Sequence, residues 1–327
     1  MFDCPHLPPV TRLLDQPMRD PSMCVAPDGW YYLTGTTGGS PLWWTGNEGI
    51  ELWRSPDLKR WESLGRVWSI EEGTWQREEV TLPEAEHPLR TVWAPEIHYI
   101  NGTFWLAYCM PGHGSSLLRS SGGEPAGPYE DVQPEGPLVP DQIDASLFQD
   151  DDGSVWFVWQ SGTLARMNDS MTELVTEPFQ IRPADHDHVG FEGAFMIKYS
   201  GIYHLFAAEF QRPGKGPVDE ASFHAAAASA QREGVEDPVE IHDKVGFYYS
   251  CMAASASDLG GPWSSRYLVA EHAGHNTVFC DRNGDWWSTI FGNDACAPIR
   301  EQPGMFRLTI GANCRWAPRD PSRGPAY

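Results

Sequence analysis

The stretch QDDDGSVWFVWQ, residues 149–160, places an Asp-Gly turn directly before an aromatic run. Asp-Gly or Asn-Gly between apolar runs is a strong signal for a β-hairpin. The same pattern recurs at four other places in the chain: APDGWYYLTG from residue 26, YINGTFWLAY from 99, KYSGIYHLFAAE from 198 and CDRNGDWWSTIFG from 280. These hairpins predict five similar antiparallel sheets.

A second element follows several of the hairpins and is interpreted as an outer strand with a Gly/Pro turn. Its copies are LWRSPDLKRWE from residue 52, RSSGGEPAGPYE from 119 and ASASDLGGPWS from 254, with RMNDSMTEL from 166 as a variant. Four-stranded antiparallel sheets repeated about an axis form a propeller. We therefore predict an all-β fold, a five-bladed β-propeller with four-stranded antiparallel blades, and a single domain over residues 1–327.

Composition narrows the classes of function. The 327 residues carry a formal net charge of −22, and such a surface repels phosphate backbones, so no nucleic acid partner is expected. No apolar run approaches the length that spans a bilayer, so no membrane partner is expected either. The seven cysteines are scattered without zinc-like spacing and are expected as free thiols. The start, MFDCPHLPPV, lacks a signal-peptide pattern; we expect a cytoplasmic protein, or a periplasmic or secreted one if a leader was trimmed away.

The hairpin repeat predicts a central pocket. Counting back eight residues from the turn of each hairpin reaches one residue on each innermost strand: Asp20, Trp93, Asp144, Glu192 and His275. Equivalent positions on the innermost strands of a propeller converge on its axis. Each residue alone fits a strand cap, but together they predict three carboxylates, an imidazole and an indole around one pocket.

Three carboxylates in one pocket indicate acid–base chemistry. Neighbouring negative charges raise the pKa of at least one carboxyl group, which separates an acid from a base of the same chemical type. Glycoside hydrolysis uses such a pair. The indole of Trp93 is expected to stack on a sugar or to line the pocket.

The motifs around these residues resemble glycoside hydrolase family 43. The resemblance rests on RDPSM from residue 19, GIELWRSPDLKRW from 49, VWAPEIHYINGTFWLAY from 92, IDASLFQDDDGSVWFVW from 143, FEGAFMIKYSGIYHLF from 191 and GHNTVFCDRNGDWW from 274. It covers about residues 15–310, in the same order as in the family. Ala145 and Ala194 stand where the family often has proline, which marks an outlying branch.

The resemblance implies an inverting glycosidase. Asp20 would be the general base, Glu192 the general acid, and Asp144 the carboxylate that tunes and orients the acid. His275 would be the axial residue, next to a water or a structural calcium ion. No cofactor is required for this chemistry, and the substrate would be an oligosaccharide or polysaccharide carrying arabinofuranosyl, xylosyl or galactosyl residues.

Other residues carry weaker predictions. Trp43 and Trp44 are expected either at the rim, stacking on sugar, or between blades. His188, beside His186, is expected to form local hydrogen bonds or to contact a hydroxylated or acidic substrate, in preference to binding a metal. Arg300 is expected near the carboxylates, as the family often has an arginine there. Two insertions, residues 65–92 and 211–245, are expected as lids or surface decoration; Ala221 to Gln231 within the second are helix formers.

Two alternatives remain open at this stage. The histidine-rich loop DHDHVG from residue 185 keeps a related propeller hydrolase of anhydro-galactose-type marine sugars in view. A non-catalytic carbohydrate-binding propeller is the alternative outside enzymes, although it predicts that a central carboxylate would be missing. The long insertions favour exo action, and we expect a monomer or a small homo-oligomer.

Overall fold

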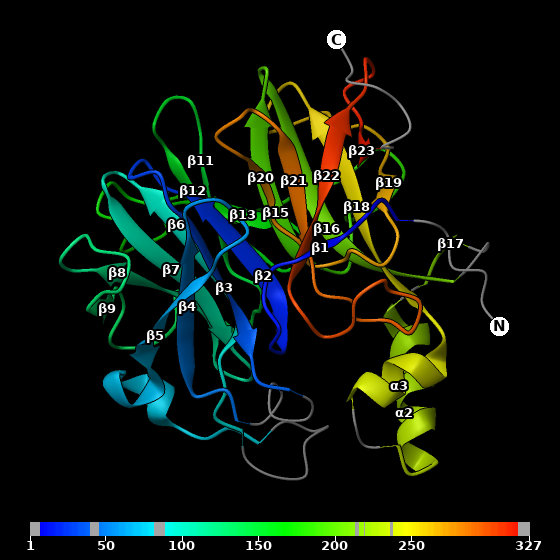
Figure 1. The fold of residues 1–327 in the computed structure, drawn as a ribbon, viewed down its shortest axis with the longest axis horizontal. Coiled ribbons are helices and arrows are strands. Elements are labelled where there is room, and N and C mark those ends of the chain that lie inside the picture. The colour runs from blue at the N-terminus through cyan, green and yellow to red at the C-terminus, as the bar shows by residue number, and fades with distance from the viewer. Residues whose placement is uncertain are drawn as a thin grey trace.

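The computed structural model describes residues 7–39, 46–81, 89–212, 216–218, 220–235 and 238–319. Five antiparallel sheets are arranged around a common axis, with the first two blades on one side of Figure 1 and the last two on the other. The predicted five-bladed β-propeller is confirmed. In each blade the predicted hairpin supplies the innermost strand and its neighbour.

The blades follow one another along the chain. Blade one contains β2 (Met18–Val25), β3 (Tyr31–Thr37), β4 (Gly49–Ser55) and β5 (Glu62–Ser69). Blade two contains β6 (Trp93–Ile100), β7 (Thr103–Met110) and β8 (Gly114–Ser120), with β9 (Tyr129–Asp131) and β10 (Val139–Pro140) both paired to β8. Blade three contains β11 (Ser146–Gln149), β12 (Val155–Trp159), β13 (Thr163–Arg166) and β14 (Phe179–Gln180). Blade four contains β15 (Glu192–Tyr199), β16 (Ile202–Arg212), β18 (Tyr248–Ala256) and β19 (Tyr267–Ala270), with β17 (Gly216–Pro217) paired to β16.

Blade five joins the two ends of the described chain. Its strands are β20 (Val278–Cys280), β21 (Trp286–Ile290) and β22 (Gly304–Ile310), and β22 pairs with both β1 (Thr11–Arg12) and β23 (Trp316–Pro318). An N-terminal strand therefore closes the last blade, with Thr11 opposite Met305. The pairing of β1 with β22 ties the start of the described chain to the last blade and so closes the circle of blades.

Apolar side chains from neighbouring blades pack between the sheets. One cluster joins blades one and two through Tyr32, Trp68 and Tyr108, and another joins blades four and five through Phe206 and Trp316. Each fully buried large side chain contributes on the order of 2 kcal/mol to the free energy of unfolding. Interdigitated aromatic layers of this kind hold the inner strands in a fixed ring.

The two insertions differ from their expected bounds and content. Residues 65–69, assigned to the first insertion, belong to β5, because their chain continues the hairpin from β4. That insertion therefore begins with two short 3-10 turns, η1 (Ile70–Glu72) and η2 (Trp75–Arg77). The second insertion forms α2 (Glu220–Arg232) and α3 (Pro238–Val245), so the helix predicted from its alanine-rich stretch is confirmed.

Both insertions lie at the same end of the blades. The first leads directly into Trp93 at the start of β6. The second leaves β16 beyond Ala208, which pairs with Glu192 at the start of β15. Among the described residues, no helix is long and apolar enough to cross a membrane.

Candidate active site

A residue in the left-handed backbone region lies at or just before the start of each innermost strand. The φ angles are 50° at Asp20, 42° at Ala94, 59° at Asp144, 63° at Gly193 and 51° at His275. Residues other than glycine adopt this conformation at a cost of about 1 kcal/mol or more, so its repetition around the axis marks a constrained site. In blades one, two and four a β-bulge accompanies it and turns successive side chains toward the centre of the propeller.

The left-handed residues show that the eight-residue count from the hairpin turns is one position off in blades two and four. Trp93 and Glu192 lie one position before the left-handed residue of their blades, where their backbones pair with Cys109 and Ala208. In blade one the corresponding residue is Arg19, opposite Thr36. Counting eight residues back treats all hairpin turns as equal. Blades two and four have two-residue turns, whereas the other three have longer ones, which shifts the count.

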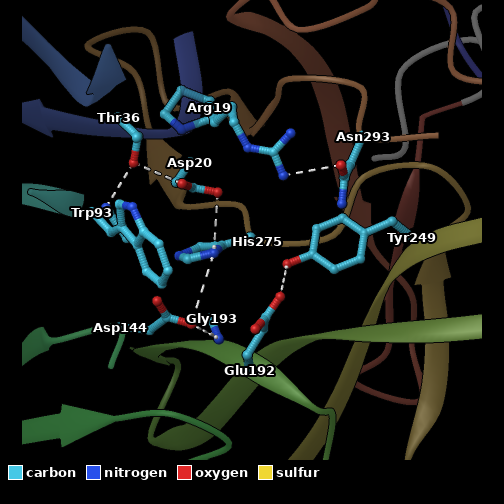
Figure 2. A network of polar contacts seen from close by, with 12 residues as sticks. Arg19, Asp20, Thr36, Trp93, Asp144, Glu192, Gly193, Tyr249, His275 and Asn293 are labelled. Carbon is cyan, nitrogen blue, oxygen red and sulfur yellow. Dashed lines mark hydrogen bonds and ion pairs between the residues drawn. The ribbon is translucent and has the colours of Figure 1, made fainter. Parts of the chain in front are cut away.

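The site nevertheless brings all five predicted residues together, as Figure 2 shows. Asp20 is held from two sides. The Thr36 hydroxyl donates to its Oδ2 over 2.8 Å, and His275 Nδ1 lies 3.2 Å from its Oδ1. Thr36 also accepts from the Ala94 amide over 2.7 Å, which ties blade one to blade two at the pocket. Both carboxylate oxygens of Asp20 are therefore oriented before any substrate binds.

Asp144 lies below His275 in Figure 2 and is almost fully buried. Its Oδ2 accepts from the Gly193 amide over 3.0 Å and lies 3.9 Å from His275 Nδ1. Burial raises the pKa of Asp144 to about 6, although the charge of His275 works against this rise. For His275 itself, burial lowers the pKa, but the carboxylates of Asp20 and Asp144 outweigh burial and raise it.

Gly193 has no room for a side chain. A Cβ atom there would lie 2.7 Å from Cγ of His275, and its φ is already 63°. The glycine after Glu192 therefore lets the backbone approach the axial imidazole closely. Its amide can then reach Asp144, which links the acid's strand to the neighbouring blade.

Glu192 is the second carboxyl group of the pocket with a raised pKa. Burial raises its pKa to about 7, and the negative charge of Asp144 adds to the rise. The Tyr249 hydroxyl donates to its Oε1 over 2.7 Å. With a pKa of about 7, Glu192 still carries its proton in a substantial fraction of molecules near neutral pH, and a general acid needs this proton.

Arg19 is a site residue that the motif RDPSM contains but that sequence analysis gave no role. Its Nη1 donates to both carboxylate oxygens of Glu301 over 2.7 and 2.9 Å, and its Nη2 donates to Asn293 over 3.0 Å. The guanidinium also lies 4.7 Å from the ring centre of Phe291. The sequence signal for this residue was its position directly before Asp20. Its partners Glu301 and Asn293 lie more than 270 positions away, so the sequence did not indicate them.

The remaining predicted residues are placed as follows. The indole of Trp93 lies beside Asp20 and Asp144 in Figure 2. His188 is half-buried, with its ring centre 4.4 Å from that of His186. Arg300 forms an ion pair of 2.8 Å with Asp243 on α3.

Figure 2 shows Arg19 next to Asp20, where its guanidinium donates to Asn293. A role of Arg300 or His188 in binding sugar stays a prediction. Trp43 and Trp44 lie outside the described residues.

A calcium ion near His275 stays a prediction. Calcium takes six to eight oxygen ligands, whereas His275 directs Nδ1 to Asp20 and Asp144. In the part of the chain that the structure describes, no three His, Cys, Asp or Glu side chains are arranged to hold a metal ion. The raised pKa of His275 favours its charged form between the two aspartates.

Comparison with known proteins gives a consistent result. The model of the glycosyl hydrolases family 43 matches residues 12–318. A β-D-galactofuranosidase of Aspergillus niger is 30% identical over 166 residues, 47% of this chain and 46% of that protein. A xylosidase/arabinosidase of Butyrivibrio fibrisolvens is 23% identical over 316 residues, 91% of this chain and 53% of that protein.

A solved endo-1,4-β-xylanase from Bacteroides thetaiotaomicron superposes with a TM-score of 0.63 at 21% identity, covering 93% of this chain and 95% of that one. This likeness concerns the fold. The chain spans about half the length of the curated relatives named above.

Proposed function

This chain belongs to family 43 of the glycosyl hydrolases, and we propose that it hydrolyses a glycosidic bond by single displacement with inversion at the anomeric carbon. Asp20 is the general base, Glu192 the general acid and Asp144 the carboxylate that orients and tunes the acid. Each comes from a different blade, so the propeller ring sets their spacing.

The reaction needs two proton transfers and one substitution. Asp20 takes a proton from a water molecule, whose oxygen forms a bond to the anomeric carbon. The bond from that carbon to the leaving oxygen breaks, and Glu192 gives its proton to this oxygen. Attack and departure on opposite faces of the sugar invert the configuration.

The difference between the two carboxyl environments carries the proposal. Asp20 accepts a hydroxyl hydrogen bond and faces an imidazole whose pKa is raised. Glu192 is buried, lies in the field of Asp144 and has a pKa raised to about 7. Two carboxyl groups with such different surroundings in one pocket match an acid and a base in the same reaction.

Asp144 links the two groups without contacting the base directly. It accepts from Gly193, the residue after Glu192, and faces His275, which also faces Asp20. Its negative charge raises the pKa of Glu192 and keeps the acid protonated. The electrostatic interaction between Asp144 and Glu192 therefore acts mainly on the protonation of the acid.

For the substrate we propose the terminal sugar of an oligosaccharide or polysaccharide, with arabinofuranosyl, xylosyl and galactosyl or galactofuranosyl residues as the candidate classes. The names of the relatives support this set. Exo action is supported by the position of both insertions at the catalytic end of the blades. The indole of Trp93 supplies an apolar wall for one sugar face.

A panel of aryl glycosides tests the proposal. Wild-type protein, Asp20→Asn and Glu192→Gln are assayed on 4-nitrophenyl glycosides of the candidate sugars, and the anomer first released is identified by proton NMR. Loss of either group is expected to lower kcat by about 10² to 10⁴ fold. On dinitrophenyl glycosides Glu192→Gln should regain most activity, because that leaving group departs without a proton, whereas Asp20→Asn should not.

Asp152→Asn is the matched control, because it changes an exposed turn carboxylate in blade three and is expected to leave turnover unchanged. Near-normal turnover by Asp20→Asn would show that the base is misassigned. Release of the retained anomer would replace single by double displacement.

A further inference from the structure

Tyr249 contacts the acid from a strand that the hairpin pattern does not reach. It lies on β18, opposite Phe210 of β16, and is 2% exposed. Its hydroxyl donates to Oε1 of Glu192 over 2.7 Å, as Figure 2 shows. Burial, together with the charge of Glu192, raises the pKa of Tyr249 well above its ordinary value, so the phenol keeps its proton and remains a donor.

The backbone of Tyr249 is fixed by a buried pair. Its amide donates to Oδ2 of Asp294 over 2.9 Å, and Oδ1 of Asp294 lies 2.8 Å from Nδ1 of His272. Its carbonyl accepts from the Gly274 amide over 3.0 Å. A Cβ at Gly274 would lie 2.7 Å from the ring of Tyr249, so the glycine before His275 leaves the space that this ring occupies.

Aromatic packing connects the ring of Tyr249 to the helical insertion. Phe210 lies 5.0 Å from Tyr249 between ring centres, and Phe223 of α2 stacks on Phe210 at 3.9 Å with an interplanar angle of 15°. Phe223 also packs against Phe247, just after α3, at 5.9 Å. These residues form one apolar cluster at the catalytic end of blade four.

We propose that Tyr249 is the positioning residue of the acid Glu192, and that the α2–α3 insertion holds the ring of Tyr249 in place through Phe223 and Phe210. The proposal rests on the proposed function, in which Glu192 donates the proton. It assigns the insertion a role in the chemistry of the site in addition to any role as a wall of the pocket.

The geometry has a definite consequence for the proton. Oε1 of Glu192 accepts from Tyr249, which leaves Oε2 as the oxygen that carries the proton to be transferred. When Oε2 gives up that proton, the negative charge that forms is shared with Oε1, where the phenol stabilises it. A hydrogen bond to the charged form lowers the pKa of a carboxyl group, and Tyr249 has this effect on Glu192.

The test compares Tyr249→Phe and Phe223→Leu with two controls. Tyr129→Phe removes a buried hydroxyl in blade two that donates to Pro125, and Phe104→Leu removes a buried ring from the core between blades one and two. Two quantities are measured for each variant: the pH dependence of kcat/KM on the aryl glycoside that the wild type cleaves, and the titration of the Glu192 carboxyl carbon by 13C NMR, assigned with Glu192→Gln.

Tyr249→Phe is expected to move both the alkaline limb and the NMR titration upward by about one pH unit, because a charge-stabilising donor is lost. It should lower kcat by roughly 10-fold with little change in KM. Phe223→Leu should shift both in the same direction by less, and the two controls should shift neither.

An unshifted titration in Tyr249→Phe would overturn the role of Tyr249. A Phe223→Leu titration identical to that of Phe104→Leu would overturn the role of the insertion. The NMR titration needs no substrate, so it decides the proposal even if no glycoside is cleaved and the proposed function fails.

Discussion

Replacing His204 by leucine is expected to remove part of the acid sensitivity of the fold. His204 lies on β16 and is 0% exposed. Within the described residues, neither of its ring nitrogens has a hydrogen-bond partner. Its ring lies edge-on to Trp316 at 5.6 Å, so its surroundings are apolar. Leucine has a similar volume and no polar atom to bury.

The magnitude follows from the pKa of the imidazole. Burial lowers the pKa of His204 to about 4, against about 6.5 in an unfolded chain. The unfolded state therefore binds more protons between these values, and stability is lost as the pH falls from about 6.5 toward about 4. A gap of about 2.5 pH units corresponds to about 3 kcal/mol of unfolding free energy. Near neutral pH the unfolding free energy of the variant should equal that of the wild type or exceed it by about 1 kcal/mol, because a buried N–H without a hydrogen-bond partner is removed.

Urea unfolding of both proteins at several values between about pH 7.5 and about pH 4.5 measures the effect. The difference in unfolding free energy isolates His204, because groups common to both proteins cancel. A constant difference between wild type and His204→Leu across this range would refute the reasoning.

The remaining predictions concern the site. The kcat/KM of the wild type should fall above about pH 7 as Glu192 loses its proton. Asp144→Asn should move this alkaline limb to lower pH, because the charge of Asp144 raises the pKa of Glu192. A pH–rate profile in which the limb does not move would contradict this. Arg19→Met should lower the unfolding free energy by about 3 kcal/mol, because Glu301 keeps a largely buried charge without its partner. Urea unfolding should show partial recovery in the double variant Arg19→Met, Glu301→Gln, and an Arg19→Met protein as stable as the wild type would exclude a structural role for the pair.

The local pattern of the chain was sufficient to predict the blades. Asp-Gly and Asn-Gly turns followed by alternating aromatic strands specify hairpins through short-range backbone geometry, and all five formed as predicted. The helix α2 could be predicted because its alanine-rich stretch consists of residues with a high local helix propensity. Asp20, Asp144 and His275 followed from the repeat because their blades have turns of similar length.

Trp93 and Glu192 were found through a count that was one position off for their blades. The pocket still contains them, because a bulge near the start of the inner strand in blades two and four turns two successive residues toward the axis. The sequence signal therefore located the pocket but not the separate positions within it. The left-handed residues at those starts became visible only in the backbone angles.

By itself, the sequence determined the propeller, its inner strands and the carboxylates at their starts, since turn chemistry and strand periodicity act over a few residues. The tertiary structure decided which groups surround those carboxylates. Arg19 reaches Glu301 across 282 positions and Tyr249 reaches Glu192 across 57. Arg300 is directed instead to Asp243 of the insertion. Such contacts depend on the packing of blades and loops remote in the chain, and so does the burial that raises the pKa of Glu192.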